Sequence, residues 1–334
     1  MKKGEREEIE WINTWWSKAN TNNRRGLLIG DSTIRQLRGS IEVLLINSYA
    51  VDLFASSFSI HDKRLVDCID LMFNNNEYQY DFIILNYGGH HGFSRLCSES
   101  LEVYVAYQEE YEKLLKYLME KCKKVVCMTG TSEVLDEDVN VIDQIREQEI
   151  IIRNRIVQEV AGQNAVDVFD LYSLMKKNRD VYSYHDRQHF NRSADYFISY
   201  HLVRFLLARK HITKQLIDRQ CEKGRDRLIN DWGFYKKCMI YGTGNAGIGL
   251  YWLLKWYDME NQISCFVVSS QITQEYVLSK PVISISSLTL EERKSNTLII
   301  ASDKYRDEMH KRAKEFEIKN VVFFNDIING LSQK

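Results

Sequence analysis

Two segments far apart in this chain carry three residues that could together cleave an ester, and the first of these residues is Ser32. It stands in the triplet Gly30-Asp31-Ser32, directly after the apolar residues 27–29. This pattern predicts a buried strand, a tight turn and the start of a helix, with the serine hydroxyl at the carboxyl edge of a sheet. A serine hydroxyl is a weak nucleophile until a base takes its proton. The triplet also fits an ordinary helix cap, so the chemical interpretation needs partners elsewhere in the chain.

The segment from Asp186 to His189 could supply both that base and a carboxylate to orient it. It lies in a polar loop, residues 182–189, immediately before a predicted helix over 193–210. Asp186 and His189 can bracket one turn, so a single loop could deliver the two groups together. The alternative is structural, with Asp186 forming the turn and His189 lying on the surface.

A glycine-rich segment between these two could stabilise negative charge. Residues 85–93 follow a predicted buried strand over 81–85 and contain three glycines and two adjacent histidines. Glycine lets the backbone approach a ligand closely. Gly88 could offer a backbone N–H, and His90 a ring N–H, to the oxyanion that develops on an attacked carbonyl. Adjacent histidines also fit an ordinary loop, but all three segments follow predicted strands in the appropriate order.

Taken together, the three segments resemble the SGNH (GDSL) hydrolases, over about residues 20–210. The resemblance implies a three-layer α/β/α sandwich built on a parallel, flavodoxin-like sheet. It also implies Ser32 as the nucleophile, His189 as the general base and then acid, and Asp186 as the carboxylate that orients His189. An acyl group would be held on Ser32 until water releases it.

The resemblance further implies an oxyanion hole formed by Ser32, Ser57, Gly88 and His90. The first three would donate backbone N–H groups, and His90 would donate from its side chain. Two positions depart from the family's pattern. Ser57 stands where the family has a glycine, although its backbone N–H would still serve. His90 stands in place of an asparagine, and its ring changes charge with pH.

Strands and helices are expected to alternate up to residue 210. After the strand at 27–29, strands are expected over 41–54, 81–85, 124–128 and 165–169, and helices over 63–74, 101–122, 141–162 and 193–210. An amphipathic helix is also expected over 5–19, where tryptophans and isoleucines recur among charges. The alternation is typical of a parallel sheet with helices on both faces. The loop over 129–133 leaves the same sheet edge as Ser32 and should lie near the active site.

A second, smaller domain is expected beyond a charged connecting helix over 211–233, so the two expected domains are 1–210 and 234–334. In the second, Gly242, Gly244 and Gly247 form G-x-G-x-x-G between a predicted strand and an apolar helix, the setting of a phosphate-binding turn. The next predicted strand ends in serines and not in an acidic residue, which disfavours nicotinamide dinucleotides.

This α/β pattern resembles the Rossmann-like modules of bacterial sugar-modifying and polysaccharide-biosynthesis proteins. Such a module could bind a nucleotide or a nucleotide sugar. It could also keep its glycines for packing alone.

The composition is that of an ordinary soluble globular protein. The 334 residues include 45 Lys and Arg against 46 Asp and Glu, and the net charge of -1 indicates no nucleic-acid partner. Seven cysteines without C-x-x-C spacing are typical of free thiols in the cytoplasm. Residues 1–9 lack a signal-peptide core, and no later segment resembles a membrane span. We therefore expect a cytoplasmic protein without a membrane partner, of undetermined oligomeric state.

The favoured function is hydrolysis of an ester, with acetyl as the expected acyl group, on a carbohydrate or another small polar substrate, with no cofactor required. An acyltransferase would use the same three residues, with a sugar hydroxyl replacing water as acceptor. A metal hydrolase would draw on Asp31, His90, His91, His185 and His189, although no H-E-x-x-H pair is present. A non-catalytic protein that binds a nucleotide or nucleotide sugar is the third alternative.

Overall fold

The chain, described here from a computed structural model, forms two compact units. The first comprises the described residues up to Asn191 together with His201–Thr213, and the second comprises Arg192–Tyr200 together with the described residues from Lys214. One helix, Ser193–Ala208, contributes to both units. The domain limits expected from the sequence remain predictions. The structure describes residues 10–17, 24–74, 78–87, 101–135, 138–179, 181–269 and 271–332.

A six-stranded sheet organises the first unit, with the strand order β1-β3-β2-β4-β5-β6. Strands β2 to β6 are parallel, and β1 pairs antiparallel with β3. The parallel part has the flavodoxin-like order 2-1-3-4-5. The strands are β1 (Ile12–Trp15), β2 (Arg25–Gly30), β3 (Ala50–Ser56), β4 (Phe82–Asn86), β5 (Val125–Met128) and β6 (Asp167–Phe169).

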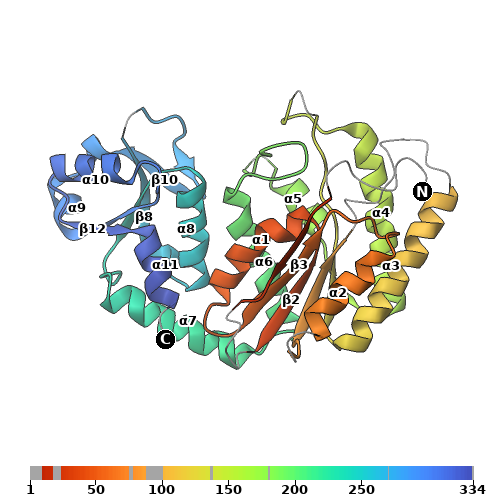
Figure 1. Cartoon of the computed structure of the whole chain (residues 1–334). Helices are drawn as coiled ribbons and strands as arrows, with labels where there is room; N and C mark the ends of the chain where they lie inside the picture. The colour runs from red at the N-terminus through yellow and green to blue at the C-terminus, as the bar shows by residue number, and fades with distance from the viewer. Residues whose placement is uncertain are drawn as a thin grey trace. The chain divides into compact units, whose positions relative to one another are not determined.

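Helices lie on both faces of this sheet, with α2, α3 and α4 on one side and α1 on the other (Figure 1). Leu27, Leu28 and Ile29 of β2 are fully buried, as a strand covered on both faces requires. The α/β class expected from the sequence is therefore confirmed. The helices are α1 (Ser32–Leu44), α2 (Arg64–Asn74), α3 (Leu101–Lys121), α4 (Gln144–Gln163), α5 (Leu171–Lys177) and the second half of α6 (Ser193–Ala208).

The main core of the first unit lies between the sheet and α2, α3 and α4. Ile29 and Leu85 of the sheet pack there with Ile69, Leu115 and Val160 of the helices. Each large apolar side chain that leaves water stabilises the fold by about 1.5–3 kcal/mol. A buried ion pair, Arg25 to Asp52 at 2.6 Å, joins β2 to β3 near the amino ends of these strands. The residues of the candidate site lie at the opposite, carboxyl ends of the strands.

The expected helix over 5–19 is wrong for the part of that span that the structure describes. Ile12–Trp15 forms strand β1, paired with β3. Isoleucine, threonine and tryptophan favour strands, and the open edge of β3 offers backbone partners that outweigh the helical spacing of the tryptophans.

The expected strand over 41–54 begins too early. Helix α1 continues to Leu44, and β3 begins only at Ala50. Ile34, Leu37, Ile41 and Leu44 share the buried face of α1 at helical spacing, so the apolar run extends the helix.

The second unit contains another six-stranded sheet, of order β12-β11-β7-β8-β10-β9. Its strands are parallel except β9, and the five parallel strands have the order 3-2-1-4-5, which is that of five of the six strands of a Rossmann sheet. The strands are β7 (Cys238–Tyr241), β8 (Ile263–Val268), β9 (Tyr276–Val277), β10 (Lys280–Ser284), β11 (Thr297–Ile300) and β12 (Asn320–Phe323). The helices are the first half of α6, α7 (Lys214–Asn230), α8 (Asn245–Trp256), α9 (Leu290–Ser295), α10 (Arg306–Glu315), α11 (Phe324–Ser332) and the short 3₁₀ turns Glu260–Gln262 and Ile285–Ser287. None of the helices described in either unit is long and apolar enough to cross a membrane.

The glycine-rich turn of the second unit joins β7 to α8, as the motif predicts. Gly242 has a φ of +115°, and a Cβ on Gly247 would lie 2.0 Å from the Gly242 carbonyl oxygen. The turn itself therefore requires these two glycines. Gly244 is the N-cap of α8, and a Cβ there would meet no atom within 4 Å. Binding of a nucleotide or nucleotide sugar at this turn remains a prediction.

We expect Gly247→Ala to destabilise the second unit by about 2–3 kcal/mol, because the added methyl collides with backbone that must shift. Gly244→Ala is the matched control, and it should cost less than about 1 kcal/mol, the difference between glycine and alanine at an N-cap. Urea unfolding followed by circular dichroism measures both variants. Equal unfolding free energies for the two would contradict the packing role assigned to Gly247.

Candidate active site

Ser32 lies where β2 ends and α1 begins, at the carboxyl edge of the first sheet. Strand β2 runs between β3 and β4, where the strand order reverses, and parallel α/β sheets bind ligands at such points. Asp31 caps α1, since its Oδ1 accepts a hydrogen bond from the Thr33 N–H at 2.9 Å. Gly30 lets β2 approach β4, because a Cβ there would lie 2.1 Å from the Asn86 carbonyl oxygen. The local chain thus fixes the position of the Ser32 hydroxyl.

The loop before α6 brings Asp186 and His189 to Ser32. His189 Nε2 lies 2.6 Å from Ser32 Oγ. His189 Nδ1 lies 2.9 and 3.0 Å from the two carboxylate oxygens of Asp186. The three side chains singled out in the sequence therefore form one continuous chain of hydrogen bonds.

Asp186 is held in its charged form by the loop that carries it. Its Oδ1 accepts hydrogen bonds from the backbone N–H groups of Gln188 and His189, both at 2.9 Å. Partial burial acts to raise the pKa of Asp186, but these two N–H groups and the His189 ring outweigh it and lower the pKa below its ordinary value. An ionised carboxylate favours the histidine tautomer with its proton on Nδ1, which leaves Nε2 free to accept the Ser32 proton.

The helix that carries Ser32 also contacts the loop that carries His189. Gln36 Nε2, one turn after Ser32 on α1, donates to the Phe190 carbonyl at 2.9 Å. Within the loop, the His185 N–H donates to the His189 carbonyl at 2.7 Å. Tyr184 and Phe190 form an isolated antiparallel β-bridge. These contacts limit the movement of His189 relative to Ser32.

The predicted oxyanion hole is described only in part. The Ser32 N–H lies in the first turn of α1, and no hydrogen bond joins it to another described residue. Ser57 does not fit its predicted role, because its N–H donates to the Trp11 carbonyl at 3.1 Å and its hydroxyl accepts from the Trp11 N–H at 2.9 Å. The Ser57 N–H is therefore already paired with the segment that leads into β1 and is not available to a substrate oxygen. Gly88 and His90 lie outside the described residues.

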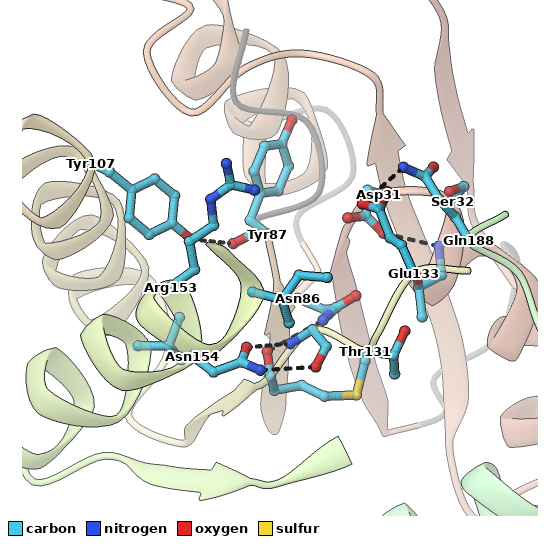
Figure 2. Close-up of a pocket in the computed structure, with 15 residues that line it drawn as sticks. Asp31, Ser32, Asn86, Tyr87, Tyr107, Thr131, Glu133, Arg153, Asn154 and Gln188 are labelled. Atoms are coloured by element: carbon cyan, nitrogen blue, oxygen red, sulfur yellow. Dashed lines mark hydrogen bonds between the residues drawn. The ribbon is translucent and has the colours of Figure 1, made fainter. Parts of the chain in front are cut away.

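A pocket of about 60 Å³ opens beside Ser32 (Figure 2). Its apolar wall comprises Tyr107, Met128, Ile150 and Val157. Gly130, Thr131 and Glu133 also line it, which confirms that the loop over 129–133 lies beside Ser32.

Three further pocket residues escaped the sequence-based reasoning: Asn86, Arg153 and Asn154. The Asn86 side chain donates to the Met128 carbonyl at 3.2 Å and so joins β4 to β5. The Asn154 side chain accepts from the Gly130 N–H at 2.8 Å and donates to the Gly130 carbonyl at 3.1 Å (Figure 2). The sequence does contain a signal for Arg153 and Asn154, which stand between the inward-facing Ile150 and Ile156 of α4. Polar side chains in such buried positions need specific hydrogen-bond partners, so they are candidates for a site.

The alternative of a metal site finds no ligand set in the part of the chain that the structure describes. No group of three or more His, Cys, Asp or Glu side chains there could hold a metal ion. Of the candidate ligands, Asp31, His185 and His189 belong to that part, whereas His90 and His91 lie outside it.

Comparison with known proteins gives no family assignment. No family model and no curated protein matches the chain. Solved structures that match include a lipase/acylhydrolase from Enterococcus faecalis, at 18% identity and a TM-score of 0.39 over 56% of this chain and 96% of that one. They also include an acetylxylan esterase from Geobacillus stearothermophilus, at 12% identity and a TM-score of 0.40 over 54% of this chain and 93% of that one. A third is an alpha/beta hydrolase enzyme from the metagenome of Lake Arreo, Spain, at 12% identity and a TM-score of 0.42 over 59% and 99%. With every TM-score here below 0.5, these likenesses assign neither family nor function, so both must be sought in the contacts of the chain itself.

Proposed function

We propose that this chain is a serine esterase in which Ser32 is the nucleophile, His189 the general base and acid, and Asp186 the residue that orients His189. The observation that carries the proposal is the 2.6 Å separation of Ser32 Oγ and His189 Nε2, with Asp186 on the other ring nitrogen. A serine is activated by an adjacent base that a third group orients, and these contacts meet that requirement.

In the first half-reaction, Ser32 Oγ bonds to the ester carbonyl carbon while its proton moves to His189 Nε2. The Ser32 N–H, a first-turn donor of α1, stabilises the oxyanion of the tetrahedral intermediate. The bond to the alcohol oxygen then breaks, and His189 gives that oxygen its proton. In the second half-reaction, His189 takes a proton from water, hydroxide displaces Ser32 Oγ from the acyl group, and the proton returns to Ser32.

The pocket beside Ser32 supports a short acyl group, with acetyl as our first candidate. The cavity is small, at about 60 Å³, and the apolar side chains of Ile150 and Val157 in its lining suit a methyl group. Thr131 and Gln188 in the same lining offer polar atoms. They are the basis for proposing a polar alcohol component, such as a carbohydrate. These side chains can hydrogen-bond hydroxyl groups.

A fluorophosphonate probe tests the assignment directly, because it reacts preferentially with a serine that an adjacent base activates. We expect labelling of one site per chain, with the modified peptide containing Ser32. Prior incubation with an aryl acetate should slow the labelling. A folded protein that takes no label, or takes it at another serine, would refute the proposal and leave the non-catalytic alternative in place.

Transfer of the acyl group to a sugar hydroxyl would need the same three residues. The two activities differ only in which molecule attacks the acyl group on Ser32. Product analysis with candidate sugar acceptors present distinguishes them, because a hydrolase releases the free acid whether or not an acceptor is added.

A further inference from the structure

A buried carboxylate holds the two residues that separate Asp186 from His189. Glu133 is only 8% exposed and lies at the pocket beside Ser32 (Figure 2). Its Oε2 accepts from Arg187 Nε at 3.0 Å, and its Oε1 accepts from Gln188 Nε2 at 3.2 Å. Each carboxylate oxygen of Glu133 is therefore used to hold the loop that carries the base.

Backbone contacts join the same two loops. The Val134 N–H donates to the Arg187 carbonyl at 2.9 Å. The Tyr184 hydroxyl donates to the Ser132 carbonyl at 2.7 Å. The loop after β5 and the loop before α6 thus meet through side chains and main chain together.

The N-terminus of α4 anchors this arrangement. Asp143 caps α4 through its Oδ1 and lies 3.4 Å from Arg187 Nη2 through its Oδ2. Arg146 Nε, on the first turn of α4, lies 3.4 Å from Glu133 Oε2. A buried charge is tolerated only when it is paired, and Arg146 and Arg187 supply the opposite charges beside Glu133.

We propose that Glu133 is a positioning residue, which holds Arg187 and Gln188 so that Asp186 and His189 meet Ser32 in register. This inference rests on the proposed esterase function. Asp186 and His189 bracket the two residues that Glu133 holds, so movement of one pair moves the other. A displacement of about 1 Å in a reacting group can cost on the order of 100-fold in rate.

The kinetic test compares Glu133→Ala with Glu147→Ala, a matched control. Glu147 is a similarly buried carboxylate on α4, but it pairs with Tyr172 and Lys176 outside the pocket lining. We expect Glu133→Ala to lower kcat for an aryl acetate by about 10–100-fold while KM changes less than about 3-fold. Glu133→Gln, which keeps one acceptor oxygen, should recover part of the loss. Glu147→Ala should reduce stability only, and an unchanged kcat in folded Glu133→Ala would overturn the proposal.

A double-mutant cycle separates positioning from direct contact with substrate. The Arg187 guanidinium pairs with Glu133 and Asp143, so we expect Arg187→Met to slow the reaction by releasing the loop. If Glu133 acts through Arg187, the double variant should be within about 3-fold of the slower single variant, since effects on one shared contact do not multiply. Fully multiplicative losses would contradict the proposal, as would an undiminished rate in Arg187→Met.

Proton NMR gives a readout that needs no substrate. The proton between His189 Nδ1 and Asp186 should give a low-field resonance, assigned by its loss in His189→Ala. We expect Glu133→Ala to shift or broaden this resonance and Glu147→Ala to leave it unchanged. If the resonance responds in this way but the native chain hydrolyses no ester, the esterase proposal fails and the positioning role stands. If hydrolysis requires Ser32 but the resonance is unchanged in Glu133→Ala, the positioning role fails.

Discussion

Replacement of Ser32 by alanine should lower kcat/KM for an aryl acetate by at least about 10⁴-fold, because the nucleophile is removed and His189 has no hydroxyl to activate. The residual rate should stay above that in water, since the pocket and the first-turn N–H of α1 are still present. Steady-state hydrolysis of the acetate, normalised to folded protein, measures the effect.

The fold should tolerate the substitution, which makes the kinetic result interpretable. Ser32 is the first residue of α1, alanine favours helices, and the cap is supplied by Asp31. We expect the free energy of unfolding to change by less than about 1 kcal/mol. Ser40→Ala is a matched control, because Ser40 lies on the same helix and its hydroxyl donates to the Leu37 carbonyl. Hydrolysis retained in Ser32→Ala would eliminate Ser32 as the nucleophile.

The part of the site that the sequence predicts is the part encoded locally. The strand, turn and helix at Ser32 follow from a short apolar run and a capping residue. Asp186 and His189 belong to one turn, in which the carboxylate accepts the N–H groups that follow it. Each pattern needs only neighbouring residues, so the sequence alone identifies it.

The features that the sequence misses depend on pairing between distant segments. Whether the Ser57 N–H is free depends on β1, and the tryptophan spacing suggested a helix there. Glu149 and Arg153 are charged residues on the buried side of α4, made tolerable by pairing with each other one turn apart. Glu133 is recognisable only once its loop is seen against Arg187 and Gln188. Contacts between distant segments produce no periodic pattern of residue types, so they cannot be predicted from the sequence in this way.

The second large effect is expected for Asp186→Asn, which should lower kcat by about 10⁴-fold with little change in shape. The amide oxygen can keep accepting from the backbone N–H groups of Gln188 and His189, as Oδ1 does now. The amide NH₂ then replaces Oδ2, which lies 3.0 Å from His189 Nδ1. A donor at that position disfavours a proton on Nδ1, so we expect the ring proton to move to Nε2. Nε2 then cannot take the proton of Ser32.

The charge of Asp186 should also make the free energy of unfolding depend on pH. The pKa of Asp186 is lowered in the folded chain, so its charged form stabilises the fold above the unfolded-state pKa of about 3.9. This contribution is lost as the pH falls through the lowered folded-state pKa. Urea unfolding should therefore show the native chain to be more stable than Asp186→Asn near neutral pH, with the difference vanishing in acid. A difference independent of pH would instead indicate a packing defect.

Asp138 provides a control for the role of a carboxylate in forming a turn. Its carboxylate also accepts a hydrogen bond from the backbone N–H two residues later, at 2.9 Å. It contacts no histidine among the described residues. Asp138→Asn should leave kcat unchanged, because an amide oxygen serves equally well in such a turn. If Asp186→Asn were also near native in rate, the carboxylate would be a turn former, as the structural alternative holds. His189 would then have to act without an orienting charge. A large loss confined to Asp186→Asn assigns the effect to the proton on the His189 ring.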